Sequence, residues 1–148
     1  MKKIAIILVA VLLCCAAFSL TACDNNQVKI TVNGKSFVVE LADTKAAAQF
    51  VKALPMTLEM HSVNGQLYAD MPDKTFSEQH DSSNPMVAGD IVLEGNNRLV
   101  MFYVFGNVNP TMTRIGKVRE EDTDAFVAAL TQAVQNASGG KVTVKISK

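Results

Sequence analysis

Short segments in which apolar and polar residues alternate recur along most of this chain, and two of the turns between them are Asn-Gly pairs. Residues 28–32 read Val-Lys-Ile-Thr-Val before Asn33-Gly34, and residues 56–60 read Met-Thr-Leu-Glu-Met shortly before Asn64-Gly65. A period of two places one face of a strand against a core. Asn-Gly is the strongest short hairpin signal because both residues accept positive φ. The chain is therefore constrained to build antiparallel hairpins.

Two amphipathic helices interrupt this succession of strands. Apolar residues at helical spacing predict one helix over residues 44–54, with Asp43 or Thr44 able to cap it, and a second over residues 120–138. Residues 71–90 are mostly polar and are expected to form a long loop. Many short strands with two helices indicate a mainly β fold, a closed eight-stranded barrel whose ends the helices plug. The expected strands are residues 28–32, 37–41, 56–60, 66–70, 91–94, 99–105, 113–118 and 142–146.

The first 22 residues have the organisation of an export signal. Lys2 and Lys3 precede an apolar run over residues 4–13, and small residues follow it. The segment ends in Leu-Thr-Ala before Cys23, which resembles the lipobox of bacterial lipoproteins. That resemblance implies cleavage before Cys23 and a diacylglycerol on its thiol. We expect a signal peptide over residues 1–22, a lipidated N-terminus and short tether over 23–27, and one domain over 28–148.

An uncleaved membrane anchor is the alternative interpretation, because residues 4–22 are nearly long enough to span a bilayer. Ser19, Thr21 and the polar run after Cys23 argue against this alternative, because they stand where an apolar span should continue. The lipoprotein interpretation predicts a lipid bilayer as partner, through acylated Cys23, and a location on the extracytoplasmic side of a cell envelope. Cys14 and Cys15 would leave with the signal, so the domain could form no internal disulfide.

Charge argues against nucleic acid as a partner. The chain has 14 basic and 14 acidic residues, and loss of Lys2 and Lys3 would leave 12 basic residues. A mature net charge of −2 offers no basic stripe for a phosphate backbone.

Five short strings stand at residues 30–35 (ITVNGK), 53–58 (ALPMTL), 89–95 (GDIVLEG), 99–103 (LVMFY) and 113–117 (TRIGK). In this order along the chain, they resemble small bacterial proteins with a cyclophilin-like fold. The resemblance covers residues 28–146 and implies an eight-stranded β-barrel with two helices. It implies no activity, because the Phe-His-Arg and Gln-Gly-Gly-Asp types of string that true cyclophilins carry are missing, and Trp is absent.

Arg114 is the leading candidate for a binding residue. It lies in one of the five strings, and in a groove its planar guanidinium would bind a carbonyl or carboxylate group. Met112, Phe102, Tyr103 and Phe105 would line the same groove. The competing interpretation places Arg114 on the outside of an alternating strand and the aromatic residues in the core.

No catalytic, metal or cofactor site is expected. His61 and His80 are the only histidines, and although Glu78 and Asp81 flank His80, no ligand spacing of a known metal site recurs. The serines lack a nucleophile-elbow context, and glycine-rich phosphate loops are missing. Three functions remain open. The first is a membrane-tethered binding or accessory module for a small molecule or an extended peptide. The second is a prolyl isomerase-like enzyme, and the third is an envelope protein that has no ligand pocket.

Overall fold

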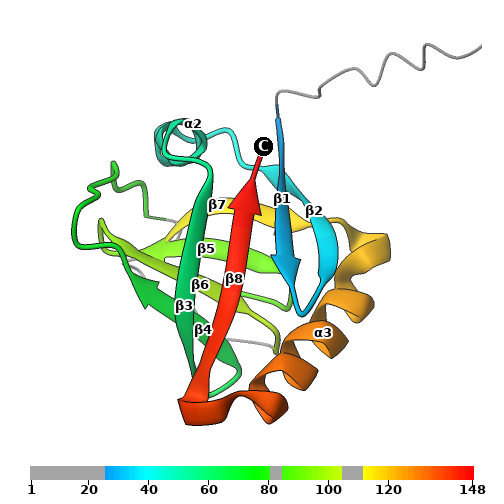
Figure 1. Cartoon of the computed structure of the whole chain (residues 1–148). Coiled ribbons are helices and arrows are strands. Elements are labelled where there is room, and N and C mark those ends of the chain that lie inside the picture. Colours follow the sequence, from blue (N-terminus) through cyan, green and yellow to red (C-terminus); the bar gives the residue numbers. More distant parts are fainter. Residues whose placement is uncertain (1–25, 81–84, 105–111) are drawn as a thin grey trace, which may run out of the picture.

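The computed structural model describes residues 26–80, 85–104 and 112–148, which form a closed antiparallel barrel of eight strands (Figure 1). Neighbours around the barrel follow the order β1-β2-β7-β5-β6-β4-β3-β8. The predicted mainly β barrel is confirmed. The strands are β1 (Gln27–Val32), β2 (Lys35–Leu41), β3 (Met56–Val63), β4 (Gln66–Asp70), β5 (Asp90–Glu94), β6 (Arg98–Phe102), β7 (Met112–Val118) and β8 (Lys141–Ser147).

Both predicted Asn-Gly turns close hairpins. Val32 pairs with Lys35 across the first turn, where Asn33 and Gly34 have φ of 49° and 74°. In the β3–β4 turn, Asn64 and Gly65 also have positive φ angles, of 49° and 79°. These dihedral angles match the right-handed twist of the flanking strands, so the turns fix the register of both hairpins.

The two helices lie at different places on the barrel. Helix α2 (Lys45–Lys52) lies at the end where β1 begins and β8 stops, and α3 (Thr123–Asn136) packs beside β1 and β8 at the other end (Figure 1). Thr44 caps α2, because its hydroxyl accepts a hydrogen bond from the amide of Ala47 at 3.0 Å. The acidic run before α3 forms a separate 3₁₀ turn, η1 (Glu120–Asp122), and a second such turn, η2 (Ser138–Gly140), precedes β8.

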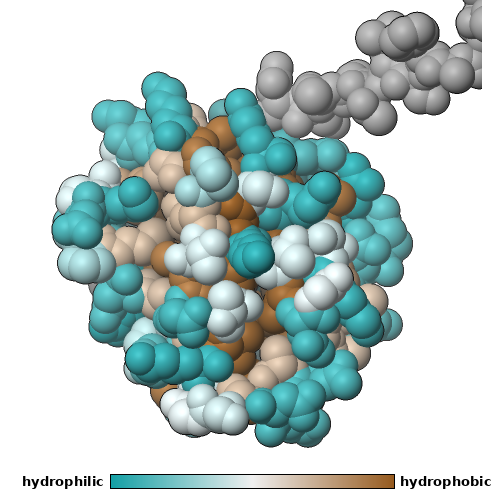
Figure 2. All heavy atoms as spheres, viewed as in Figure 1, coloured by the Kyte–Doolittle hydropathy of each residue, from teal (hydrophilic) through white to brown (hydrophobic). Residues whose placement is uncertain are grey.

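The main core fills the barrel and extends under the helices. Phe126 of α3 meets Phe37 of β2 edge-on, with ring centroids 5.4 Å apart. The buried residues of α3 are Phe126, Ala129 and Leu130, and Val127, Ala133 and Val134 beside them are half-buried. On the face formed by β1, β3 and β8, hydrophobic residues show only between more hydrophilic ones (Figure 2).

Two sequence predictions need correction. The strand expected over residues 99–105 ends at Phe102, and the chain bends at residues 103–104, so β6 is shorter than its apolar run. The loop over residues 71–90 is not simply polar. Met71, Phe76 and Met86 are buried, and they fasten the loop to the barrel.

A second apolar cluster lies on the outer face of β5, β6 and β7. In β6, Leu99 and Met101 belong to the main core, so Val100 and Phe102 point to the opposite side of the sheet. The cluster is fully or almost fully buried, and Tyr68 of β4 packs against it. We call this set the outer cluster: Met86, Val92, Val100, Phe102 and Met112.

In the part of the chain that the structure describes, no helix combines the length and the apolar character needed to cross a membrane.

Candidate functional site

Arg114 stands on β7 beside the outer cluster. It pairs with Val92 of β5, immediately after a register shift between Ile91 and Val92. Its side chain is 23% exposed, and its Nη1 lies 2.5 Å from Oδ1 of Asp90. Its Nη2 lies 3.7 Å from the sulfur of Met86. The guanidinium is therefore held between a carboxylate and the edge of the outer cluster.

Asp90 is the partner that fixes this arginine. Its side chain has no exposed surface, and its Oδ2 accepts a hydrogen bond from the amide of Val87 at 2.8 Å. Burying a carboxylate is costly unless it is paired and hydrogen-bonded, and Asp90 meets both conditions. The local turn places it, since the amide of Asp90 also donates to the carbonyl of Val87. Arg114 thus has a defined position before any ligand arrives.

A hollow of about 350 Å³ opens beside Arg114, and we call it the Arg114 hollow. Three separate segments build its wall: residues 42–44 just before α2, residues 79–80, and β7. Thr44 connects the segment before α2 to β7, because its hydroxyl donates to the carbonyl of Arg114 at 3.2 Å. The amide of Gln79 donates to Oγ1 of Thr113 at 2.8 Å and so connects residues 79–80 to β7. The lining residues are Ala42, Thr44, Gln79, His80 and Arg114.

The structure separates the other residues of the predicted groove. Phe102 and Met112 are buried in the outer cluster, next to the Met86 that Arg114 contacts, and do not line the hollow. The hydroxyl of Tyr103 lies 2.8 Å from that of Ser62, and Tyr103 does not line the hollow. Phe105 lies outside the described residues. Arg114 and Met112 share one strand, but the aromatic residues do not form a surface around Arg114.

Sequence reasoning missed the residues that complete the hollow. Asp90 stands in one of the five strings, but nothing in the spacing links it to an arginine 24 positions later. Thr44 was recognised as a possible helix cap, which it is, and its second role depends on β7 lying beside it. His80 was considered only as a metal ligand.

The two histidines have separate partners among the described residues, and Asp81, which flanks His80 in the sequence, lies outside those residues. Nε2 of His80 lies 2.8 Å from a carboxylate oxygen of Glu78, and His61 stacks on Tyr68 with ring centroids 5.6 Å apart. Over residues 26–80, 85–104 and 112–148, no group of three or more His, Cys, Asp or Glu side chains gathers closely enough to hold a metal ion.

A second arginine makes an exposed ion pair. Nε of Arg98 donates to Oδ1 of Asp70 at 2.6 Å, and its guanidinium carbon lies 5.2 Å from the centroid of the Tyr68 ring. The hydrogen bond from Arg98 holds the pKa of Asp70 below its ordinary value, and the charge of Arg98 acts in the same direction. Both side chains of the pair are more than two-fifths exposed. This pair is a surface feature, unlike the buried pair of Arg114 and Asp90.

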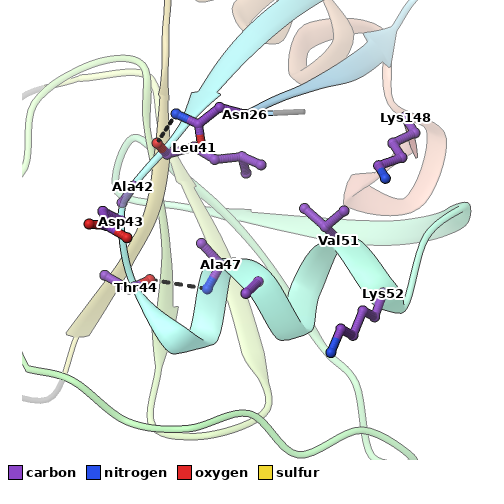
Figure 3. Close-up of a pocket in the computed structure, with 10 residues that line it drawn as sticks. Asn26, Leu41, Ala42, Asp43, Thr44, Ala47, Val51, Lys52 and Lys148 are labelled. Carbon is purple, nitrogen blue, oxygen red and sulfur yellow. Dashed lines mark hydrogen bonds between the residues drawn. The ribbon is translucent and has the colours of Figure 1, made fainter. Parts of the chain in front are cut away.

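Another hollow, of about 320 Å³, lies between α2 and the start of β1 (Figure 3). Its floor is apolar and includes Leu41, Ala47 and Val51. Lys52 and Lys148 lie on the side of Val51, and Asp43 lies on the opposite side (Figure 3). Ala42 and Thr44 line this hollow as well as the Arg114 hollow, so the two share a wall.

Comparison with known proteins gives one family match. The sequence profile of the cyclophilin-like family matches residues 30–147. No curated protein sequence matches this chain.

Two solved structures share the fold at low sequence identity. McbB, whose structure was determined in complex with tryptophan, superposes with a TM-score of 0.61 at 17% identity over 82% of this chain. That match spans 44% of McbB, so this chain corresponds to less than half of it. The hypothetical protein AF2241 from Archaeoglobus fulgidus superposes with a TM-score of 0.54 at 14% identity, over 82% of this chain and 92% of AF2241. These similarities establish the fold.

Proposed function

The chain belongs to the cyclophilin-like family, and on that premise we propose that it is a binding module without catalytic activity, tethered to a membrane through acylated Cys23. The ligand is a small molecule or an extended peptide. It presents a carbonyl or carboxylate oxygen to Arg114. The module works on the extracytoplasmic side of a cell envelope.

The arrangement of Arg114 in its hollow is the observation that carries this proposal. The guanidinium is planar and keeps its charge, and the buried carboxylate of Asp90 fixes its position. A group that is already positioned loses little conformational freedom on binding, which favours affinity. Thr44, Gln79 and His80 line the same hollow and add polar side chains. The hollow thus combines a positioned guanidinium with polar side chains, which suits an oxygen-rich ligand.

The position of the aromatic residues supports binding without catalysis. A prolyl isomerase needs an apolar surface that holds the proline ring next to its arginine. Phe102 has no exposed surface, and Tyr103 is hydrogen-bonded to Ser62, so neither presents a ring in the Arg114 hollow. The chain also contains no Trp.

Prolyl isomerisation is the second candidate function, and one observation favours it. The outer cluster lies directly beside Arg114, so a modest shift of Met86 would bring apolar surface next to the guanidinium. Exchange NMR on a proline tetrapeptide with catalytic amounts of the mature lipoprotein separates the two functions. The binding module leaves the cis/trans exchange rate unchanged. Faster exchange that Arg114→Ala abolishes and Arg98→Ala retains would contradict it and establish the isomerase.

The anchor is supported by the lipobox at residues 20–23 and by the positive and apolar parts of the leader. One acyl chain binds a bilayer only reversibly, and two or more give a durable anchor. Labelled fatty acid should enter the wild-type protein in its host and should not enter the Cys23→Ser variant. Continued labelling of that variant would disprove the anchor and leave the Arg114 hollow unaffected.

A further inference from the structure

One end of the barrel receives the chain from the anchor, and we call it the tether end. Three peptide units separate Cys23 from Asn26, where the described structure begins. The amide of Leu41 donates to the carbonyl of Asn26 at 2.9 Å, and Nδ2 of Asn26 lies 3.3 Å from the carbonyl of Leu41. These two hydrogen bonds attach Asn26 to the end of β2, so the position of Asn26 is fixed relative to the barrel.

The short tether keeps this end close to the bilayer. Three extended residues span at most about 10 Å. The Debye length at physiological ionic strength is about 8 Å, close to the maximum span of the tether, so this end of the barrel can bring its charges within range of a membrane surface potential. Charges at the opposite end of the barrel are beyond it.

The charges at the tether end favour an anionic surface. Three exposed lysines stand there, Lys45, Lys52 and Lys148, and none forms an ion pair within the described ranges. The acids at this end of the described structure are Asp43 and Glu40, and Glu40 lies 3.6 Å from Nε of Arg119. Asp24, in the tether, lies outside the described residues. Asp43 lies on the side of the hollow opposite Lys52 and Lys148 (Figure 3), so those two lysines present a local positive edge beside the apolar surface of Val51.

We propose that the tether end binds the headgroups of anionic phospholipids in the bilayer that holds Cys23, with Lys52 and Lys148 facing the phosphates. This inference rests on the proposed anchor and adds an orientation to it. Each lysine near an anionic surface contributes about fivefold to membrane partition. The docked orientation also places the Arg114 hollow next to the membrane, because it shares Ala42 and Thr44 with the hollow between α2 and the start of β1.

Hydrogen exchange of the mature lipoprotein in nanodiscs tests this orientation. One set of nanodiscs contains phosphatidylcholine alone, and the other contains equal amounts of phosphatidylcholine and phosphatidylglycerol. Peptides from α2 should exchange more slowly in the anionic nanodiscs, and added salt should remove the difference. Neutralising two lysines with Lys52→Gln and Lys148→Gln should lower the ratio of docked to undocked protein about 25-fold. The matched control is Lys35→Gln with Lys141→Gln, at the opposite end of the barrel, and it should retain the protection.

The outcomes distinguish the orientation from the anchor. The intact mass of the same sample reports whether Cys23 is acylated. An acylated protein whose α2 exchanges equally in both kinds of nanodisc overturns the orientation and leaves the anchor standing. The orientation is also overturned if the control variant at the opposite end of the barrel loses as much protection of α2 as the Lys52→Gln, Lys148→Gln variant. A protein without acyl chains overturns the anchor, and the orientation falls with it.

Discussion

The fully buried carboxylate of Asp90 accepts a hydrogen bond from the guanidinium of Arg114, which is itself 23% exposed. The two residues come from different strands, β5 and β7, which pair directly in the barrel although β6 separates them in the sequence. The buried member of the pair fixes the position, and the partly exposed member faces the hollow. Under the proposed function, one side chain therefore serves both a ligand site and a structural ion pair.

Removal of either member should destabilise the fold, and by different amounts. Arg114→Met leaves Asp90 buried, with the amide of Val87 as its remaining partner among the described residues, and should lower the free energy of unfolding by about 3–5 kcal/mol. Asp90→Asn should lower the free energy of unfolding by less, because water can partly hydrate the guanidinium of Arg114, which is 23% exposed. Arg98→Met is the control. Its ion pair is exposed, and the loss should stay below about 1 kcal/mol. Urea denaturation measures all three, and equal losses for Arg114→Met and Arg98→Met would contradict the buried role of Asp90.

The pKa of Asp70 should depend on Arg98. The hydrogen bond from Arg98 lowers the pKa of the folded carboxyl below its ordinary 3.8. A depressed folded pKa adds stability above pH 3.8 that is lost as the pH falls through the folded value. NMR titration of Arg98→Gln should show the pKa of Asp70 returning toward 3.8, and the stability difference from wild type should shrink below that pH. An unchanged titration of Asp70 would show that Arg98 is not the cause.

Gly116 should tolerate no side chain. It pairs with Leu41 where β2 meets β7, and an added Cβ would lie 2.4 Å from the carbonyl oxygen of Glu40 and 2.9 Å from Cγ1 of Val39. Because backbone blocks the space, Gly116→Ala should raise the energy of the folded state by about 1–3 kcal/mol. Gly95→Ala serves as comparison. Its Cβ meets nothing within 4 Å, so its cost comes from the φ of +61° alone. Chemical denaturation gives both values, and a neutral Gly116→Ala would contradict the close approach.

Much of the fold could be predicted from the sequence, because the relevant signals are local. Alternation and the Asn-Gly turns located the hairpins, and the strand over residues 66–70 was predicted with its observed bounds. Errors arose where tertiary packing overrides the local pattern. The apolar run at residues 99–105 suggested a longer β6, and the buried Met86 and Phe76 stand in a stretch whose composition is mostly polar.

The candidate site could be predicted only in part. Arg114 was identified from the string that contains it, but its partner Asp90 and its neighbours Thr44 and His80 are far away in sequence. Their proximity follows from the pairing of β5 with β7 and from the position of α2, which no local periodicity encodes. Phe102 was named both as a groove residue and as a core residue, and the structure places it in a buried cluster.

Native mass spectrometry of the protein extracted from its own host membranes tests the tethered binding module most directly. One spectrum reports the covalent acyl mass on the chain that begins at Cys23 and any ligand held without a covalent bond. We predict an acylated wild-type protein with a releasable adduct, an acylated Arg114→Lys variant without the adduct, and an Arg98→Lys control that keeps it. A wild-type protein that carries no adduct, or an adduct that survives Arg114→Lys unchanged, would contradict the Arg114 hollow as the binding site.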